Sequence, residues 1–309
     1  MQTENSLLTD LKNTFRTGGM TVKLIFVNVL VFIAIGILEV VSSIIGGISG
    51  AFILDVTDSI FALFTPIREF IVRPWGLFTS IFAHYNFIHL LLNMVFLFSV
   101  GRIFEQFFSA KRLLYTYILG GVLGGLLELI AHLILPSVGG TMVIGASGAV
   151  MAILVATAFY QPKLTVSIWG VFNMRLIYLA LIFILVNLYN AGMGTKDGTA
   201  YFAHLGGALL GFLSVRNPFS MNNIINRGIR MGDGLLSIFK RRETKNGNFR
   251  YSKEKASTTK RFKTDEEYNL EAKKRQARID AILDKISKSG YESLTRQEKD
   301  FLFNQSKND

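Results

Sequence analysis

Six apolar segments alternate with polar stretches along the first two-thirds of the chain. They cover residues 22–45, 87–103, 113–135, 147–160, 176–191 and 201–215. A helix needs about 17–25 mostly apolar residues to cross a bilayer. The fourth and sixth segments are short and rich in small residues, which is typical of spans enclosed by neighbouring helices. The pattern predicts an all-α polytopic membrane protein with a six-transmembrane-helix bundle at residues 22–217.

The polar residues 1–21 before the first segment are expected to form a cytosolic N-terminal segment. They are too long, and their flanks are wrong, for a cleaved signal peptide, so the first segment is interpreted as a retained span. Residues 46–86 form a long first outer loop that is too apolar to be solvated. We expect short amphipathic helices there, lying in the outer interface with Trp75 at headgroup depth.

The last third of the chain is polar and contains no apolar stretch long enough to span a bilayer. Residues 218–264 are rich in Asn, Lys, Arg, Ser and Thr and are interpreted as a basic flexible linker. Residues 265–309 then show helical spacing at Ile279, Ile282, Leu283 and Ile286, and a capping-box pattern at Thr295-x-x-Glu298. They predict a small cytosolic, soluble helical hairpin whose partner the sequence does not name.

Composition agrees with a membrane protein: half of the 309 residues are hydrophobic and only 18% are charged. This excludes a disordered chain and argues against an ordinary cytosolic enzyme. The chain has no cysteine, which excludes disulfides, a thiolate zinc site and a cysteine nucleophile. No cofactor is expected.

The formal charge of +11 is distributed unevenly. Residues 1–217 hold 12 Lys and Arg against 9 Asp and Glu, whereas residues 218–309 hold 21 against 13. In the first part, basic residues gather at alternate ends of the spans, which predicts a cytoplasmic location for both termini. These residues are Lys12, Arg16, Lys23, Arg102, Lys111, Arg112, Lys163, Arg175 and Arg216, and Arg227 and Arg230 follow at the start of the tail.

The basic tail is expected to lie near anionic lipid headgroups of the same membrane face. A nucleic-acid partner is not expected, because no binding fold is visible and acidic residues dilute the positive charge.

A first chemical signal is Gly145-Ala146-Ser147-Gly148, which opens the fourth apolar segment. The first N–H groups of a helix have no partner within it, and the helix dipole favours negative charge there. That arrangement suits a serine nucleophile whose reaction forms an oxyanion nearby. A plain N-cap serine fits the same pattern.

A second signal is His204, followed by Gly207-x-x-x-Gly211 in the sixth segment. The two glycines predict a close-packing helix face, and we expect it to meet the Ser147–Gly148–Met151 face of the fourth segment. His204 would then reach the Ser147 hydroxyl as a base. A buried interhelical hydrogen bond is the competing interpretation.

A third signal is His84-x4-His89-x3-Asn93 at the start of the second segment. His89 and Asn93 are four residues apart and share a helix face, where they are suitable hydrogen-bond donors for an oxyanion. His84 precedes the helix and is interpreted as tying the long loop to it. A zinc site is disfavoured, because no carboxylate falls at metal-ligand spacing.

Together, in this order and on spans 2, 4 and 6, these three motifs resemble the rhomboid family of intramembrane serine proteases, over about residues 20–217. The resemblance implies a six-helix bundle with a water-filled cavity open to the outer face. It makes Ser147 the nucleophile and His204 the general base. The Ser147 N–H, His89 and Asn93 would form the oxyanion hole, with His84 structural. Gly145, Gly148, Gly207 and Gly211 would be supporting residues.

Met151 departs from the resemblance, because many rhomboids carry an aromatic residue at this position, four residues after the nucleophile. Methionine still packs against an imidazole edge. We therefore expect Met151→Tyr to be tolerated and Met151→Asp not. The C-terminal hairpin is similar to a short module appended to some bacterial rhomboids, and the resemblance does not supply its role.

The sequence thus predicts a serine endopeptidase of a bacterial inner membrane that cleaves single-span membrane proteins near the outer membrane boundary. The alternative is a non-catalytic protein of the same fold that binds or escorts transmembrane helices. A channel or transporter built on Glu128 and His132 is disfavoured, because spans 4 and 6 lack a polar lining. These two residues, four apart on span 3, are left open as a proton-linked site or a polar patch.

Overall fold

The chain divides into two compact units, Met1–Pro218 and Phe219–Asp309. In this computed structural model the first unit is described over residues 7–45, 50–135, 140–168, 172–194 and 199–216. The second is described at residues 276, 278–288, 293–295 and 297–301. The predicted linker at 218–264 lies outside the described residues, as do parts of the predicted hairpin.

Among the described residues of the first unit, four helices are long and apolar enough to cross a membrane: α2 (Met20–Ile45), α6 (Phe87–Phe107), α7 (Ala110–Ile134) and α9 (Leu176–Met193). Two shorter helices, α8 (Ser147–Tyr160) and α10 (Tyr201–Arg216), occupy the fourth and sixth apolar segments. Every predicted span therefore coincides with a helix, to within a few residues. That α8 and α10 also cross the membrane stays a prediction.

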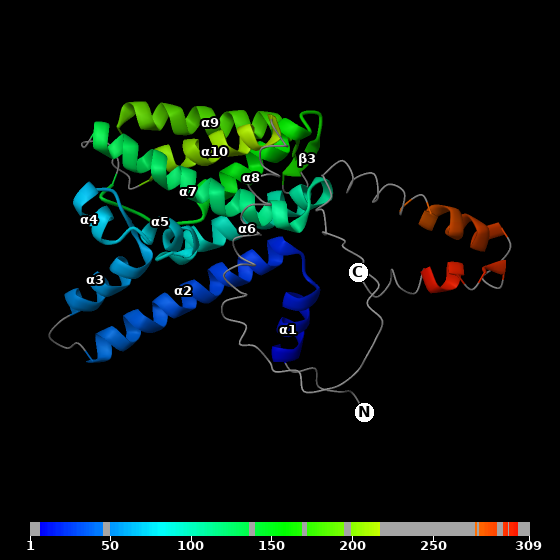
Figure 1. Cartoon of the computed structure of the whole chain (residues 1–309), viewed down its shortest axis with the longest axis horizontal. Helices are drawn as coiled ribbons and strands as arrows, with labels where there is room; N and C mark the ends of the chain where they lie inside the picture. Colours follow the sequence, from blue (N-terminus) through cyan, green and yellow to red (C-terminus); the bar gives the residue numbers. More distant parts are fainter. Residues whose placement is uncertain are drawn as a thin grey trace, which may run out of the picture. The chain divides into compact units, whose positions relative to one another are not determined.

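Helix α8 forms the centre of the first unit. Its residues 148–158 are all buried, and it packs against α6, α7, α9 and α10. Figure 1 shows these helices running alongside one another, with α8 among them. Short Gly and Ala side chains let the neighbours approach its backbone, so a helix of only 14 residues becomes the core of the bundle.

The long first loop folds into short elements, as the sequence predicted. They are α3 (Gly50–Phe61), β1 (Leu63–Phe64), α4 (Ile67–Val72), α5 (Gly76–Thr79) and a 3-10 turn, η1 (Ser80–Phe82). The Trp75 indole N–H donates to the Ser59 carbonyl at 2.8 Å, and the Thr79 hydroxyl donates to the Ile60 carbonyl at 2.8 Å. Both bonds fasten α5 and the turn before it to α3. The depth of Trp75 in a membrane stays a prediction.

Two small antiparallel sheets were not predicted. Strand β1 pairs with β2 (Met142–Val143), joining the first loop to the segment just before α8. Strands β3 (Thr165–Ile168) and β4 (Phe172–Arg175) form a hairpin between α8 and α9. Two-residue strands leave almost no periodic signal, because their pairing depends on a distant segment.

Helix α2 joins the bundle through polar contacts with α6 and α7. Helix α1 (Leu7–Thr17) precedes α2, whose first N–H group, at Met20, donates to the Glu105 carboxylate of α6 at 2.6 Å. A carboxylate at a helix N-terminus satisfies unpaired N–H groups and complements the helix dipole. Further along α2, the buried Asn28 amide donates to the Tyr117 hydroxyl of α7 at 3.0 Å.

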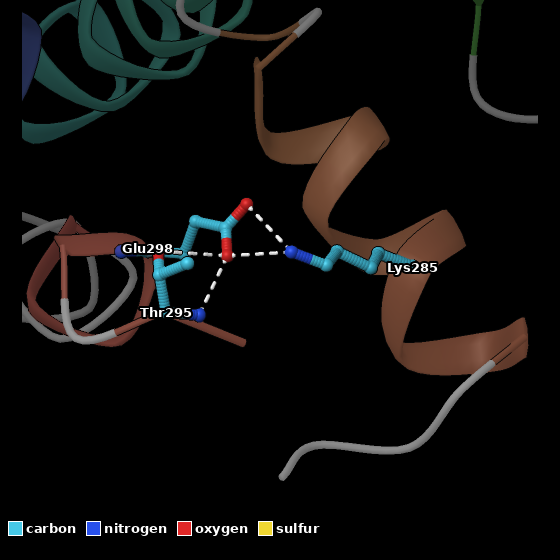
Figure 2. Close-up of polar contacts among 3 residues, drawn as sticks. All are labelled: Lys285, Thr295 and Glu298. Atoms are coloured by element: carbon cyan, nitrogen blue, oxygen red, sulfur yellow. Dashed lines mark hydrogen bonds and ion pairs between the residues drawn. The ribbon is translucent and has the colours of Figure 1, made fainter. Parts of the chain in front are cut away.

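The C-terminal unit has helical stretches at residues 278–288 and 297–301. The predicted capping-box bonds are present: the Glu298 N–H donates to the Thr295 hydroxyl at 3.3 Å, and the Glu298 carboxylate accepts from the Thr295 N–H at 2.7 Å. The Lys285 ammonium approaches the same carboxylate at 2.9 Å, so Glu298 links the two helical stretches (Figure 2).

Candidate active site

Ser147 is the first residue of α8, and the backbone before it is shaped by Gly145. The φ angle of Gly145 is 127°, a conformation that side-chain-bearing residues rarely adopt. A Cβ atom there would also lie 2.8 Å from Cε1 of the His89 ring. Only glycine therefore lets the chain turn into α8 while the His89 imidazole packs against the turn.

The hydroxyl of Ser147 lies against the imidazole of His204, on α10. Their atoms Oγ and Nε2 are 2.7 Å apart, within hydrogen-bond distance. Both residues are partly exposed, in contrast to residues 148–158 of α8, which are buried. The hydroxyl and the base are therefore in contact at a point that can be reached from outside the protein.

Glycines bring α8 and α10 together at this point. A Cβ on Gly207 would collide with the Gly148 carbonyl oxygen, and one on Gly211 would collide with the Ala152 carbonyl oxygen. The expected Gly207-x-x-x-Gly211 face therefore meets α8 backbone to backbone. Gly148 itself lies close to the Ala203 carbonyl, next to His204. Such contact leaves no room for adjustment, so the Ser147–His204 separation is set by the helix packing.

Helix α10 is held at both ends by α7. At its N-terminus, the Ala203 N–H donates to the Glu128 carboxylate at 2.9 Å, and at its C-terminus Arg112 donates to the Ser214 carbonyl at 2.8 Å. Both side chains are at most 2% exposed. An acid at the start and a base at the end complement the helix dipole.

Glu128 and His132 lie four residues apart on α7. Glu128 hydrogen bonds to α10, one residue before His204. Atom Nδ1 of His132 has no hydrogen-bond partner among the described residues. Glu128 therefore anchors α10, and the choice between a polar patch and a proton-linked site for the pair stays a prediction.

His89 and Asn93, on α6, lie across from the serine. His89 is in the first turn of α6, which Asn86 caps by accepting from the Ile88 and His89 N–H groups at 2.8 and 3.1 Å. The Asn93 amide donates one hydrogen bond to the His89 carbonyl at 2.9 Å. An amide carries two N–H hydrogens, so a second donor remains for a ligand.

A cavity of about 460 Å³ joins these groups. It is lined by His89, Asn93, Met142, Val143, Ile144, Ser147, Thr199, Ala200 and His204. Ser147 and His204 are 57 residues apart in the sequence, and His89 lies still farther from both. All three motifs nevertheless line one space. The cavity is large enough to hold several water molecules beside the serine.

The loop before α8 is fastened from two sides. The Thr65 N–H donates to the Thr141 carbonyl at 3.0 Å, and the Gly145 N–H donates to the Ser80 carbonyl at 2.9 Å. The Ala146 N–H donates to Nε2 of His84 at 3.3 Å. Burial, with a contribution from the nearby His89, lowers the pKa of His84 to about 4, so its ring is neutral and able to accept this bond. His84 thereby ties the first loop to the turn before Ser147.

Met151 is buried in the apolar core around α8, and its effect on His204 stays a prediction.

Asn187, on α9, was not predicted as a site residue, yet its Oδ1 lies 2.6 Å from Nδ1 of His204. A carboxylate that orients a catalytic histidine would be conspicuous in an apolar segment, because a charge is costly there. An asparagine within an apolar segment is costly as well, and that cost was the signal that could have identified it.

No group of three or more His, Cys, Asp or Glu side chains is placed to bind a metal among the residues that the structure describes. The chemistry available in this cavity is that of a hydroxyl, an imidazole and hydrogen-bond donors.

Comparison with known proteins identifies the families that two regions of the chain resemble. Residues 72–216 match the Rhomboid domain, and residues 263–308 match a family of unknown function, DUF6576. RHOMBOID-like protein 5 of Arabidopsis thaliana is 30% identical over 138 residues, which are 45% of this chain and 42% of that protein. Rhomboid-like protease 3 of Toxoplasma gondii is 29% identical over 141 residues, 44% of this chain and 49% of that protein.

The relatives differ in activity, since Inactive RHOMBOID-like protein 8 of Arabidopsis thaliana is 29% identical over 134 residues, 43% of this chain and 35% of that protein. The chain spans less than half the length of these curated relatives. The matched region contains every residue of the cavity described above. Residues 72–216 therefore match a rhomboid domain, and together with the apolar helices this match indicates a multi-pass membrane protein.

Proposed function

We propose that the chain is an intramembrane serine endopeptidase in which Ser147 is the nucleophile and His204 the general base. The observation that carries the proposal is the 2.7 Å contact between Ser147 Oγ and His204 Nε2 in a cavity reached from outside. An activated serine requires a base within hydrogen-bond reach, and this pair meets that requirement.

In the first step, Ser147 Oγ attacks the carbonyl carbon of the substrate peptide bond while Nε2 of His204 accepts the hydroxyl proton. The carbonyl oxygen becomes an oxyanion. The Ser147 N–H at the start of α8, the His89 ring and the free amide hydrogen of Asn93 are the proposed donors to it. Proton transfer from His204 to the leaving amine releases one product and leaves an acyl-enzyme.

In the second step, Nε2 of His204 removes a proton from a water molecule, whose oxygen attacks the acyl carbon. The bond from the acyl carbon to Ser147 Oγ then breaks, and His204 returns the proton to that oxygen, which frees Ser147. Hydrolysis needs water, and the bilayer interior lacks it. The cavity supplies space for that water. Helix α8 has 14 residues and extends about 21 Å, less than the ~30 Å hydrocarbon thickness, so Ser147 at its start would lie below the membrane surface.

The finer features of the assignment follow from the same proposal. All six helices α2, α6, α7, α8, α9 and α10 would cross a bacterial inner membrane, with both termini cytoplasmic by the distribution of basic residues. The substrates would be single-span membrane proteins, cleaved near the outer boundary of the membrane. The C-terminal residues 265–309 would form a cytosolic module, reached through a basic linker near anionic headgroups.

The test uses purified protein reconstituted in liposomes with a model single-span substrate. We expect cleavage by the native chain, none by Ser147→Ala or His204→Ala, and labelling of Ser147 by a fluorophosphonate only when His204 is present. Undiminished cleavage by Ser147→Ala would overturn the proposal.

A second candidate is a non-catalytic protein that binds transmembrane helices, and the inactive relative is the observation that favours it. It predicts substrate binding with no product and no fluorophosphonate labelling of the native chain. The same reconstitution therefore separates the two candidates.

A further inference from the structure

Asn187 is the buried polar residue of α9, a helix on which many large apolar side chains are exposed. Its side chain is 5% exposed, whereas its neighbours Leu185 and Leu188 are 62% and 57% exposed. In a membrane protein such a pattern places Asn187 on the inner face of α9 and the leucines towards lipid. An amide in this position is costly unless both of its polar ends are hydrogen bonded.

Both ends of the Asn187 amide have partners. Atom Nδ2 donates to the Phe183 carbonyl at 2.8 Å, and Oδ1 lies 2.6 Å from Nδ1 of His204. Rotating the amide by half a turn would bring its oxygen against the Phe183 carbonyl oxygen, two acceptors with no hydrogen between them. The Phe183 contact therefore fixes which end of Asn187 faces the histidine.

This orientation determines the tautomer of the imidazole. Because Asn187 presents an acceptor, Nδ1 of His204 must carry the hydrogen and donate it. A neutral imidazole then has its lone pair on Nε2, 2.7 Å from the Ser147 hydroxyl. The contacts form one continuous series, from α9 through α10 to α8.

We propose that Asn187 is a positioning residue that holds His204 in the tautomer and ring orientation needed to accept the Ser147 proton. The inference rests on the proposed function and adds a third residue to the Ser147–His204 pair. It assigns to a neutral amide the orienting role that a carboxylate performs in other serine hydrolases. Asn187 does not touch the reacting atoms, so its effect acts through His204.

A purely structural role for Asn187 makes different predictions. An interhelical hydrogen bond that only joins α9 to α10 would affect unfolding and leave the chemical step of the folded protein unchanged. A positioning role lowers kcat while KM stays nearly constant, because substrate binding does not involve the imidazole tautomer. The split between kcat and KM therefore separates the two roles.

The test compares three variants of the full chain in liposomes. Asn187→Leu has a similar volume and no acceptor. Asn187→Asp keeps an acceptor oxygen in either protonation state and, when protonated, can also donate to the Phe183 carbonyl. Thr157→Val is the control, because the buried Thr157 hydroxyl donates only to the Ile153 carbonyl of its own helix in the contacts described, at 2.8 Å.

We expect Asn187→Leu to lower kcat about 10- to 100-fold, part of the ~10²- to 10⁴-fold that a general base contributes, with KM changed by less than about two-fold. Asn187→Asp should recover most of the loss, and Thr157→Val should keep kcat near the native value. Fluorophosphonate labelling of Ser147 should slow in parallel with kcat, and thermal unfolding in detergent measures stability separately.

Native kcat in Asn187→Leu, or an equal fall in Thr157→Val at an equal loss of thermal stability, would overturn the positioning role. If Asn187→Leu does not fold, Asn187→Asp decides alone: cleavage no faster than that of His204→Ala would overturn the role. Loss of cleavage in Ser147→Ala together with native kcat in Asn187→Leu would refute this inference and leave the proposed function standing. Undiminished cleavage by Ser147→Ala would refute the proposed function itself.

Discussion

Helices α2 and α8 are both apolar, yet α2 is mostly exposed on the outside of the bundle and α8 is enclosed within it. Helix α2 has 26 residues, and only 17% of the apolar stretch that could span the membrane is buried inside the protein. Helix α8 has 14 residues, with every residue from 148 to 158 buried. Large aliphatic side chains on α2 face outward, and small ones on α8 admit neighbouring helices.

The difference shows that hydropathy identifies an apolar helix without telling what surrounds it. In α2 an apolar side chain meets lipid, where changes of size cost little. In α8 the same apolar character fills a protein core, where volume and polarity are fixed by packing. The candidate nucleophile is at the start of the enclosed helix, where its position is set by four neighbours.

The largest loss of stability should come from placing a charge on the enclosed helix α8. We expect Met151→Asp to destabilise the protein by about 4 kcal/mol or more, because an unpaired carboxylate would lie in an apolar core. Met151→Tyr should be tolerated and retain cleavage. Thermal unfolding in detergent and cleavage in liposomes measure both effects, and equal cleavage by the two variants would contradict the expected packing of residue 151 beside His204.

The next largest effect should come from adding one methyl group at the contact between α8 and α10. Gly207→Ala should cost about 3 kcal/mol in the free energy of unfolding, since its Cβ collides with the Gly148 backbone. Gly36→Ala on α2 is the matched control, because nothing lies within 4 Å of a Cβ there. Similar unfolding temperatures for the two variants would show that the helices do not differ in enclosure.

Removing the anchor of α10 should have a moderate effect. Glu128→Leu is expected to cost about 2 kcal/mol, because the Ala203 N–H loses its acceptor inside the bundle. Glu128→Gln keeps an acceptor oxygen and should lose less. Unfolding of the two variants is compared in detergent. A smaller loss for leucine than for glutamine would mean that the carboxylate is not anchoring the helix.

The smallest effect belongs to the exposed surface of the C-terminal unit. The Thr295 N–H, Lys285 and the Thr295 hydroxyl lower the pKa of Glu298 to about 2. Because folding lowers this pKa, the ionised Glu298 stabilises the folded unit at pH values above the ordinary carboxyl pKa, near 4.5. This stabilisation is lost as the pH falls towards 2. NMR titration of the Glu298 side chain should show this transition, and Glu298→Gln should remove it. A midpoint near 4.5 would contradict the contacts in Figure 2.

Much of the candidate site could be predicted because its signals are local. The glycines around Ser147, the spacing of Gly207 and Gly211, and the pair His89 and Asn93 each lie on one helix or at its start, where sequence spacing determines which side chains share a face. Asn187 could not be assigned in this way. Its partner is on another helix, and nothing in the spacing of α9 identifies that partner.

The sequence alone determined the positions of the apolar helices, the segregation of the basic tail and the three motifs, because hydropathy and helical periodicity are properties of neighbouring residues. Only the tertiary structure decided that α8 is enclosed and α2 is not, that β1 pairs with β2, that Glu128 and Arg112 hold the ends of α10, and that Asn187 meets His204. Each of these is a contact between segments far apart in the chain. Such contacts depend on which helices become neighbours and how closely their small residues let them approach.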